Sequence, residues 1–189
     1  MSDEVFSKAK VFLTCLESPI ETVERGLRRA REAGLTTILN PAPAGPLLER
    51  LDLLKLVDVL TPNAGEAAML VGMPADREPT DEMAAEVGRE LQYRGAQAVV
   101  VTRGADGVVV VDDETAQVPA VKAQPQDTTA AGDAFNGALA TSLSEGRMLR
   151  DAVRWGIHAA AISVTRAGAQ PSLPTRAEID ASLASDAHA

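Results

Sequence analysis

The sequence is poor in aromatic residues and in cysteine, and it has no excess of positive charge. Aromatic residues make up 3% of its 189 residues, and Cys15 is the one cysteine, so an internal disulfide is impossible. It has 18 basic against 27 acidic residues, which gives a net charge of −9. A nucleic-acid backbone needs clustered Lys and Arg, so we expect no nucleic-acid partner. Small phosphate ligands are not excluded, because backbone amides can hold them.

Long apolar segments are also lacking. No run reaches the roughly 18 apolar residues that a transmembrane helix needs. The acidic N-terminus Met1–Glu4 has no apolar region of the kind found in secretory signals. We therefore expect no membrane partner and a cytoplasmic protein with a reduced cysteine. The apolar content of 46% is that of a globular chain, and the length suits a single domain over residues 1–189.

Short apolar runs alternate with helical periods along the chain. The runs predict strands over 11–16, 36–39, 57–60, 98–101, 108–111 and 116–118. Apolar residues at helical spacing predict helices that begin near residues 19, 47, 64, 81, 132, 149 and 176. This alternation indicates an α/β fold with a doubly wound, mainly parallel sheet and a small antiparallel edge. Ligands of such sheets bind at the carboxyl ends of the strands.

Capping signals mark several expected helix ends. A Ser, Thr or Asn followed three residues later by Glu is a capping box, which begins a helix. The pairs with this spacing are Ser18 with Glu21, Asn63 with Glu66, and Thr175 with Glu178. The glycines that we expect to end helices are Gly34, Gly95 and Gly168. For two helices the sequence predicts both the first and the last residue, and they run over 132–144 and over 149–167.

The segment from Asp127 to Asp133 is the first candidate for chemistry. Ala130, Ala131 and Gly132 precede a helix, so their N–H groups and the helix dipole can bind an anion. Asp133 would lie beside that anion, where a carboxylate can take a proton from a hydroxyl that attacks a phosphoryl group. The alternative is a tight turn with an acidic residue in the first helical turn.

Three further segments follow expected strands, and each has two interpretations. Asn63 and Glu66 form a capping box, or both face a nucleotide's Mg²⁺ through water. The segment 102–107 is an ordinary β-turn, or its glycines let the backbone approach a nucleotide. Glu17 is the charged end of a buried run, or it touches a substrate. The side chains of 102–107 are Thr102, Arg103, Gly104, Ala105, Asp106 and Gly107.

Several well-known catalytic patterns are absent from the sequence. It has no Gly-x4-Gly-Lys-Ser/Thr loop, no Gly-x-Gly-x-x-Gly turn and no Gly-x-Ser-x-Gly elbow. His158 and His188 have no ligand partners at the spacing of a zinc site, so we expect none there. His158 is interpreted as a helix residue with a packing or solvent role. Trp155 and Cys15 are interpreted as core residues.

Taken together, these segments resemble the C-terminal part of the PfkB carbohydrate kinase family. The stretch Asp127-Thr-Thr-Ala-Ala-Gly-Asp133-Ala-Phe-Asn-Gly-Ala is similar to the family's anion-hole and catalytic-base signature, and it is highly specific. The resemblance runs over about residues 10–184. The other matching stretches, in order, are Leu16-Glu-Ser-Pro19, Asn40-Pro-Ala-Pro-Ala44, Thr61-Pro-Asn63-x-x-Glu66 and Val164-Thr-Arg-Ala-Gly-Ala-Gln-Pro-Ser172. The Asn-Pro-Ala-Pro and Gly-Ala-Gln-Pro-Ser stretches point to the ribose kinases within that family.

The resemblance implies a ribokinase-like three-layer α/β/α fold and ATP-dependent phosphorylation of a sugar hydroxyl, with ribose O5 as the leading acceptor. Asp133 would be the base, and the amides of Ala130, Ala131 and Gly132 would form the anion hole. Asn63 would approach the triphosphate, Glu66 would order Mg²⁺ through water, and Glu17 would contact the sugar. The segment 102–107 would lie along the nucleotide.

A monovalent cation, usually K⁺, is also implied beside the anion hole. Bound to carbonyls of that loop, it would fix the direction of the loop's amides. The residues that would supply its ligands, mostly as carbonyl oxygens, are Asp127, Thr129, Ser163, Arg166, Gly168 and Ser172. Where the family often places a polar residue near adenine, this sequence has Ile157, followed by His158, so the contact with adenine would be apolar, or His158 would take the place of the polar residue.

The family's N-terminal part, with central strands, the lid and most sugar-binding residues, has no counterpart in this sequence. Three interpretations follow: a sugar kinase presented as a C-terminal fragment or a shortened gene product, a nucleotide-binding module without catalysis, or a structural half that pairs with another polypeptide. The sugar is also open within the family. An unpaired edge on the strand over 11–16 would favour self-association or a homo-oligomer.

Overall fold

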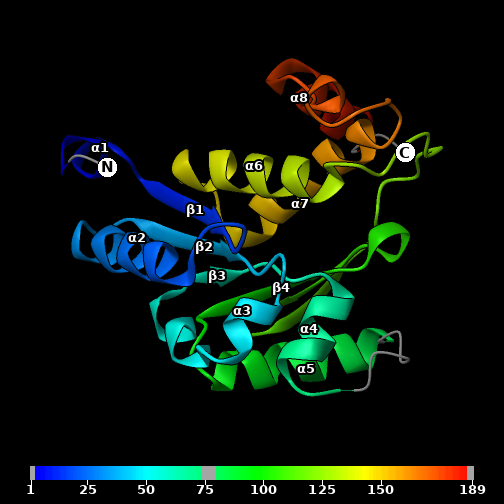
Figure 1. Cartoon of the computed structure of the whole chain (residues 1–189). Coiled ribbons are helices and arrows are strands. Elements are labelled where there is room, and N and C mark those ends of the chain that lie inside the picture. The colour runs from blue at the N-terminus through cyan, green and yellow to red at the C-terminus, as the bar shows by residue number, and fades with distance from the viewer. Residues whose placement is uncertain (1–2, 74–79, 187–189) are drawn as a thin grey trace. The chain divides into compact units, whose positions relative to one another are not determined.

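The computed structural model describes residues 3–73 and 80–186, and they form two compact units (Figure 1). Unit 1 consists of the described parts of Met1–Arg103 together with Val108–Gln117. Unit 2 consists of Gly104–Gly107 and the described part of Val118–Ala189.

Unit 1 is built on a six-stranded sheet whose strands follow chain order, from β1 to β6. The strands are β1 (Val11–Cys15), β2 (Thr36–Asn40), β3 (Val59–Leu60), β4 (Ala98–Thr102), β5 (Val108–Val111) and β6 (Thr115–Val118). The first four pair in parallel, and β5 pairs with β4 in antiparallel register. The predicted mainly parallel sheet with an antiparallel edge is therefore confirmed.

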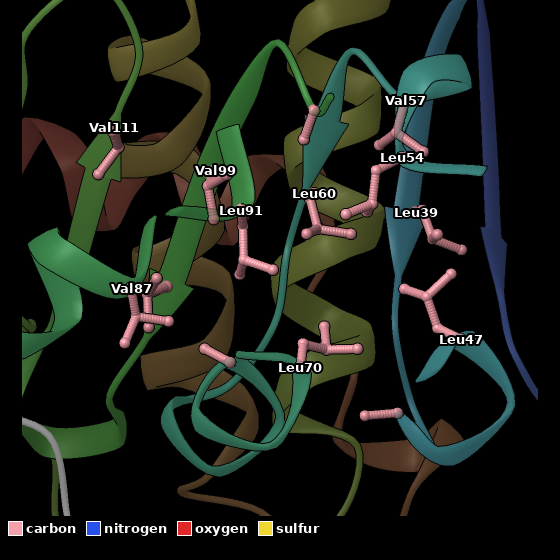
Figure 2. Packing of buried hydrophobic residues seen from close by; sticks show 14 of the residues in the cluster. Leu39, Leu47, Leu54, Val57, Leu60, Leu70, Val87, Leu91, Val99 and Val111 are labelled. Carbon is pink, nitrogen blue, oxygen red and sulfur yellow. The ribbon is translucent and has the colours of Figure 1, made fainter. Parts of the chain in front are cut away.

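Helix α1 (Asp3–Lys8) precedes β1, and the helices between β1 and β4 share one apolar cluster with the sheet (Figure 2). These helices are α2 (Ile20–Glu32), α3 (Gly45–Leu48), the 3₁₀ helix η1 (Leu51–Leu56), α4 (Ala64–Leu70) and α5 (Asp81–Tyr93). In α5, Val87 and Leu91 lie one turn apart and are buried. Gly88 of α5 lies so close to β5 that a Cβ there would meet Val111 Cγ2 at 2.6 Å.

Unit 2 contains the helices of the C-terminal part. They are η2 (Gly104–Asp106), α6 (Ala131–Ser144), α7 (Leu149–Ser163), η3 (Gln170–Ser172) and α8 (Arg176–Asp186). Helices α6 and α7 pack together through small residues such as Ala138 and Ala159, with Trp155 and Ile179 in the same cluster. The expectation that Trp155 belongs to the core is confirmed, because it is 2% exposed. No helix among the residues described is long and apolar enough to cross a membrane.

Several predicted helix ends lie elsewhere in the structure. Helix α2 begins at Ile20 with Pro19 as N-cap and has no side-chain cap, so the predicted box of Ser18 and Glu21 is wrong. The ψ angle of 135° at Pro19 is extended, which places Ser18 one residue too far away to cap. The capping pair of Asn63 and Glu66 is formed in full.

Helix α7 is four residues shorter than predicted, because it ends at Ser163 rather than near residue 167. The carbonyl of Val164 instead accepts hydrogen bonds from the amides of Gln126 and Asp127, at 2.7 and 3.1 Å. Contacts distant in sequence thus replace the last helical turn. Gly168, the expected stop, has φ +84° in the loop that follows.

Two predictions for unit 1 also need correction. The helix expected to carry Leu47 to Leu54 is two short helices, because Arg50 adopts φ −136° and ψ 41° between them. The strand β1 is half-exposed rather than buried, since it is the last strand at one edge of the sheet. Leu13 at its centre is 38% exposed, and Cys15 is half-buried.

The burial pattern of the leucines gives a stability prediction for unit 1. Leu54 is fully buried in the apolar cluster, so Leu54→Ala should lower the free energy of unfolding by about 2–5 kcal/mol. Leu48, six residues away and 43% exposed, is the matched control, and Leu48→Ala should cost about 0.5 kcal/mol. Urea unfolding of both variants measures the difference. Equal losses would contradict the cluster as described.

Candidate functional site

The N-terminus of α6 has an unusual backbone conformation. Ala130, the N-cap residue, has φ 61° and ψ 12°, and no other non-glycine residue among those described has a positive φ. For a residue with a Cβ, this left-handed conformation costs roughly 1–2 kcal/mol. Such strain persists only where the surrounding structure holds it, and it is found preferentially at functional sites.

Amide groups are left over at this helix start. The first N–H groups of an α-helix have no intrahelical partner, and Ala130 offers no side-chain cap. The amide of Ala131 donates to the carbonyl of Thr128 at 3.2 Å. The sequence predicts an anion hole formed by three amides, and one of them, that of Ala131, has a backbone partner in this structure. The amides of Ala130 and Gly132 remain to bind an anion at the positive end of the helix dipole.

Asp133 lies in the first turn of α6 and its side chain is exposed. It lines a cavity of about 240 Å³ within unit 2, together with apolar and small residues of α6, α7 and α8. The polar side chains on this cavity besides Asp133 are Thr141 and Arg176. The carboxylate therefore faces a space that a hydroxyl-bearing molecule can enter.

The carboxylate of Asp127 joins two loops. Its Oδ1 accepts a hydrogen bond from the Thr129 amide at 2.9 Å, and its Oδ2 accepts one from the Gly168 amide at 2.8 Å. Hydrogen bonds from the Thr129 side chain, then from the Gly168 and Thr129 amides, lower the pKa of Asp127 to about 2. The side chain is therefore ionised at neutral pH and engaged at both oxygens.

The loop that carries Gly168 holds further residues named for the cation site. Ser163 and Ser172 are fully buried, and their hydroxyl oxygens lie 2.9 Å apart. Arg166 forms an ion pair with Glu178, and its hydrogen bond is the main cause that lowers the pKa of Glu178 to about 2. The structure thus places all six of these residues in two adjoining loops, 126–130 and 163–172.

These two loops suit a monovalent cation by the chemistry of their donors. Backbone carbonyls and hydroxyl oxygens are the ligands that bind K⁺ in proteins. Each carboxylate oxygen of Asp127 accepts one backbone hydrogen bond, and the Asp127 carbonyl is a further oxygen donor in the same loop. In the described ranges, no group of three His, Cys, Asp or Glu side chains is arranged to hold a metal ion.

In unit 1, two candidate residues lie together at the carboxyl ends of β3 and β4. Asn63 forms a parallel bridge with Thr102, and the Thr102 amide donates to the Pro62 carbonyl at 2.9 Å. Asn63 Oδ1 accepts from the Glu66 amide at 2.8 Å, and Glu66 Oε2 accepts from the Asn63 amide at 2.9 Å. Burial raises the pKa of Glu66. The hydrogen bond from the Asn63 amide acts in the opposite direction and is the smaller of the two effects.

The remaining strand-end candidates are placed as follows. Glu17 is exposed just after β1. Arg103 forms an ion pair with Asp81 of α5, which gives it a structural partner. Gly107 has φ +87°, and a Cβ there would lie 2.3 Å from the Val118 carbonyl oxygen, so only glycine fits. Gly104, Ala105 and Asp106 are exposed.

Ile157 and His158 are helical and buried, with 6% and 2% of their surface exposed. His158 Nδ1 lies 2.8 Å from Ser182 Oγ of α8, and burial lowers the pKa of His158 although Asp186 opposes the shift. The packing role interpreted for His158 is confirmed. His188 lies outside the described residues.

Two residues that support the candidate site were not singled out from the sequence. Asn40 Nδ2, at the end of β2, donates to the Thr61 carbonyl at 2.8 Å and so ties β2 to the segment that leads to Asn63. Asn136 is buried, and its Nδ2 donates to the Gly132 carbonyl at 2.9 Å. A polar side chain directly after a strand was the available signal for Asn40. For Asn136, the signal was an amide within an otherwise apolar helix face.

The structure is that of an α/β protein in which helix α6 starts without a side-chain cap at a left-handed residue, and comparison with known proteins identifies its family. The profile described as pfkB family carbohydrate kinase matches residues 3–176. The chain therefore belongs to the pfkB family of carbohydrate kinases, and the resemblance found in its sequence is confirmed.

The relatives and structural neighbours include ribokinases. The chain is 40% identical over 178 residues to a ribokinase of Haemophilus influenzae, which covers 94% of this chain and 56% of that protein. It is 36% identical over 186 residues to a ribokinase of Schizosaccharomyces pombe, covering 96% and 57%. A crystal structure of a ribokinase from Thermotoga maritima superposes with a TM-score of 0.85 at 34% identity, covering 97% and 60%.

These comparisons confirm the ribokinase-like α/β fold. A structure of Arabidopsis thaliana ribokinase complexed with ribose and ATP has a TM-score of 0.86 at 28% identity, over 96% of this chain and 58% of that one. The chain thus spans a little over half the length of the relatives and structures that it matches.

Proposed function

We propose that this chain carries the phosphoryl-transfer part of an ATP-dependent sugar kinase, and that the sugar is ribose, phosphorylated at O5. The observation that carries the proposal is the start of α6, where unused amides, a helix dipole and the Asp133 carboxylate lie within one turn. Family membership and the identities of 36–40% to ribokinases support ATP and ribose as substrates.

In the proposed reaction, Asp133 is the general base. The sugar hydroxyl forms a bond to the terminal phosphorus of ATP while the bond from that phosphorus to ADP breaks, and the hydroxyl proton goes to the Asp133 carboxylate. A base in this position contributes roughly 10²–10⁴-fold to the rate. The exposed side chain of Asp133 and its cavity support this role.

The amides at the start of α6 stabilise the charge on the transferring group. Ala130 and Gly132 supply the N–H groups, and Ala131 joins them if its 3.2 Å bond to Thr128 opens. A preorganised donor of this type is worth roughly 3–4 kcal/mol in other enzymes. The strained conformation of Ala130 supports the proposal, because it directs amides that an ordinary helix start would not expose in this way.

We assign the candidate nucleotide contacts residue by residue. Asn63 contacts the phosphates, and Glu66 holds Mg²⁺ through water, as a hard ion that retains several waters does. Bound Mg²⁺ neutralises phosphate charge. Thr102 and the segment 103–107 line the nucleotide, and Glu17 contacts the sugar. Ile157 and His158 can touch adenine only through their small exposed fractions of 6% and 2%.

A monovalent cation is assigned to the loops 126–130 and 163–172. Their carbonyls and hydroxyls would hold K⁺, whose charge stabilises the orientation of the loop that precedes α6. The named ligand residues are Asp127, Thr129, Ser163, Arg166, Gly168 and Ser172. The two loops already adjoin through hydrogen bonds, which supports a shared site.

Self-association of the chain is the second part of the proposal. The edge strand β1 has half-exposed residues along its length, including Leu13 at 38%. An open edge with apolar side chains is a template for pairing with another strand. A homo-oligomer, or a companion polypeptide, would cover it.

Asp133→Asn is the direct test of the kinase. We expect the variant to lower ribose-dependent release of ADP from ATP by roughly 10²–10⁴-fold, because the amide cannot accept the proton. Asp151→Asn, which changes the acidic residue in the first turn of α7, is the matched control and should leave the rate unchanged. ATP binding without ribose-dependent turnover in the wild type would favour a nucleotide-binding module instead.

Potassium dependence can be measured with the same assay. We expect faster ADP release in KCl than in tetramethylammonium chloride at equal ionic strength, because the bulky organic cation cannot be surrounded by loop carbonyls. The Asp151→Asn variant should respond like the wild type. Equal rates in the two salts would exclude the cation site.

The open edge predicts an effect of Leu13→Lys on association. A charge on an edge strand opposes pairing, so this variant should sediment as a smaller species than the wild type at the same concentration. Tyr93→Lys, which removes an 89% exposed ring from α5, is the control and should not change sedimentation. A wild-type chain that sediments as a compact monomer would contradict self-association.

A further inference from the structure

The turn that leads into α6 is held from several sides. Asp127 Oδ1 accepts from the Thr129 amide two residues later, and the Thr128 carbonyl accepts from the Ala131 amide. These two bonds close the backbone around residues 127–131. Ala130, which is left-handed, lies between this turn and the first residue of α6.

The same turn is fixed to a distant loop of unit 2. Asp127 Oδ2 accepts from the Gly168 amide at 2.8 Å, 41 residues along the chain. The amides of Gln126 and Asp127 both donate to the Val164 carbonyl. Of these links, the carboxylate of Asp127 is the single group that bonds both to the turn and to the distant loop.

We propose that the Asp127 carboxylate is a positioning group, which holds Ala130 left-handed by bonding the Thr129 and Gly168 amides together. It thereby aims the first amides of α6. Only the statement that these amides bind the transferring phosphoryl group rests on the proposed function. An ionised acceptor makes hydrogen bonds roughly twice as strong as a neutral one, so it can hold a strained residue that neutral turn bonds would release.

The hydrogen bonds of the Asp127 carboxylate do not require a bound cation. Both side-chain oxygens of Asp127 are already used by N–H donors, so the clamp forms from the protein alone. A monovalent cation on the loop carbonyls would add to it without replacing it. The clamp is therefore expected to persist in a salt whose cation is too large to bind.

Amide hydrogen exchange by NMR tests the clamp without requiring activity. In choline chloride, the Thr129 and Gly168 amides of the wild type should be protected, and Asp127→Asn should speed their exchange by about tenfold or more. Asp112→Asn is the matched control, because Asp112 also accepts from the amide two residues later, at 3.0 Å, in another turn. Leu139 in α6 reports that the fold is retained.

A double-mutant experiment then tests the link to Ala130. Glycine adopts positive φ without the steric cost, so in the Asp127→Asn background Ala130→Gly should restore slow exchange of the Ala131 and Ala134 amides, which donate to the Thr128 and Ala130 carbonyls. Ala140→Gly, inside the same helix, removes a methyl group at ordinary helical φ and should not restore it. If Asp127 only stabilised the fold, Ala130→Gly would not restore slow amide exchange more than Ala140→Gly does.

Three results would overturn the proposal: fast exchange of either amide in wild-type protein, protection that appears only in KCl, or equal rescue by both glycine variants. The first two need only the wild-type chain, so they decide the matter even if Asp127→Asn does not fold. If the wild type shows clamp protection but no ribose-dependent turnover, the kinase proposal fails and the clamp stands. If turnover depends on Asp133 while Asp127→Asn changes neither exchange nor kcat, the clamp fails alone.

Discussion

The parallel pairing of β1 to β4 imposes most of the arrangement of unit 1. Each strand must be followed by a connection that returns to the sheet's other end, which is why α2, α3, η1, α4 and α5 lie between consecutive strands. These helices bury their apolar residues in one cluster with the sheet. All four strands end at the same edge, where the Asn40 side chain donates to the Thr61 carbonyl and Asn63 forms a parallel bridge with Thr102.

In unit 2, the start of helix α6 lacks the usual stabilising contacts of a helix N-terminus. Helix α6 starts without a side-chain cap, and its first amides are kept open by a turn that contains a left-handed alanine. A cap by Ser or Asp would be more stable in isolation, because it would satisfy one of these amides. The Asp127 carboxylate offsets this loss by bonding to two other amides. Stability lost at the helix start is thus recovered beside it, while the amides stay available for an anion.

Sequence patterns predicted well those elements whose information is local. The run over Val108–Val111 is a strand with the bounds predicted, and helix α5 begins at Asp81, where the apolar spacing predicted it. Boundaries failed where distant groups compete for the backbone. The end of α7 is one case, since Gln126 and Asp127 take the carbonyl of Val164. The start of α2 failed for a local reason, because the extended ψ of Pro19 makes that residue, and not Ser18, the N-cap.

The candidate site also has features that the sequence predicts locally and features that depend on distant contacts. The motif from Asp127 to Asp133 and the pair of Asn63 and Glu66 were evident from residue types and spacing, because short polar patterns at strand and helix ends carry their own signal. The sequence by itself therefore determined the family, the order of elements and the candidate residues for phosphate chemistry. Only the tertiary structure decided that Asp127 bonds Gly168, that Ala130 is left-handed and that β1 is an edge. Each of these depends on contacts between segments that no local pattern encodes.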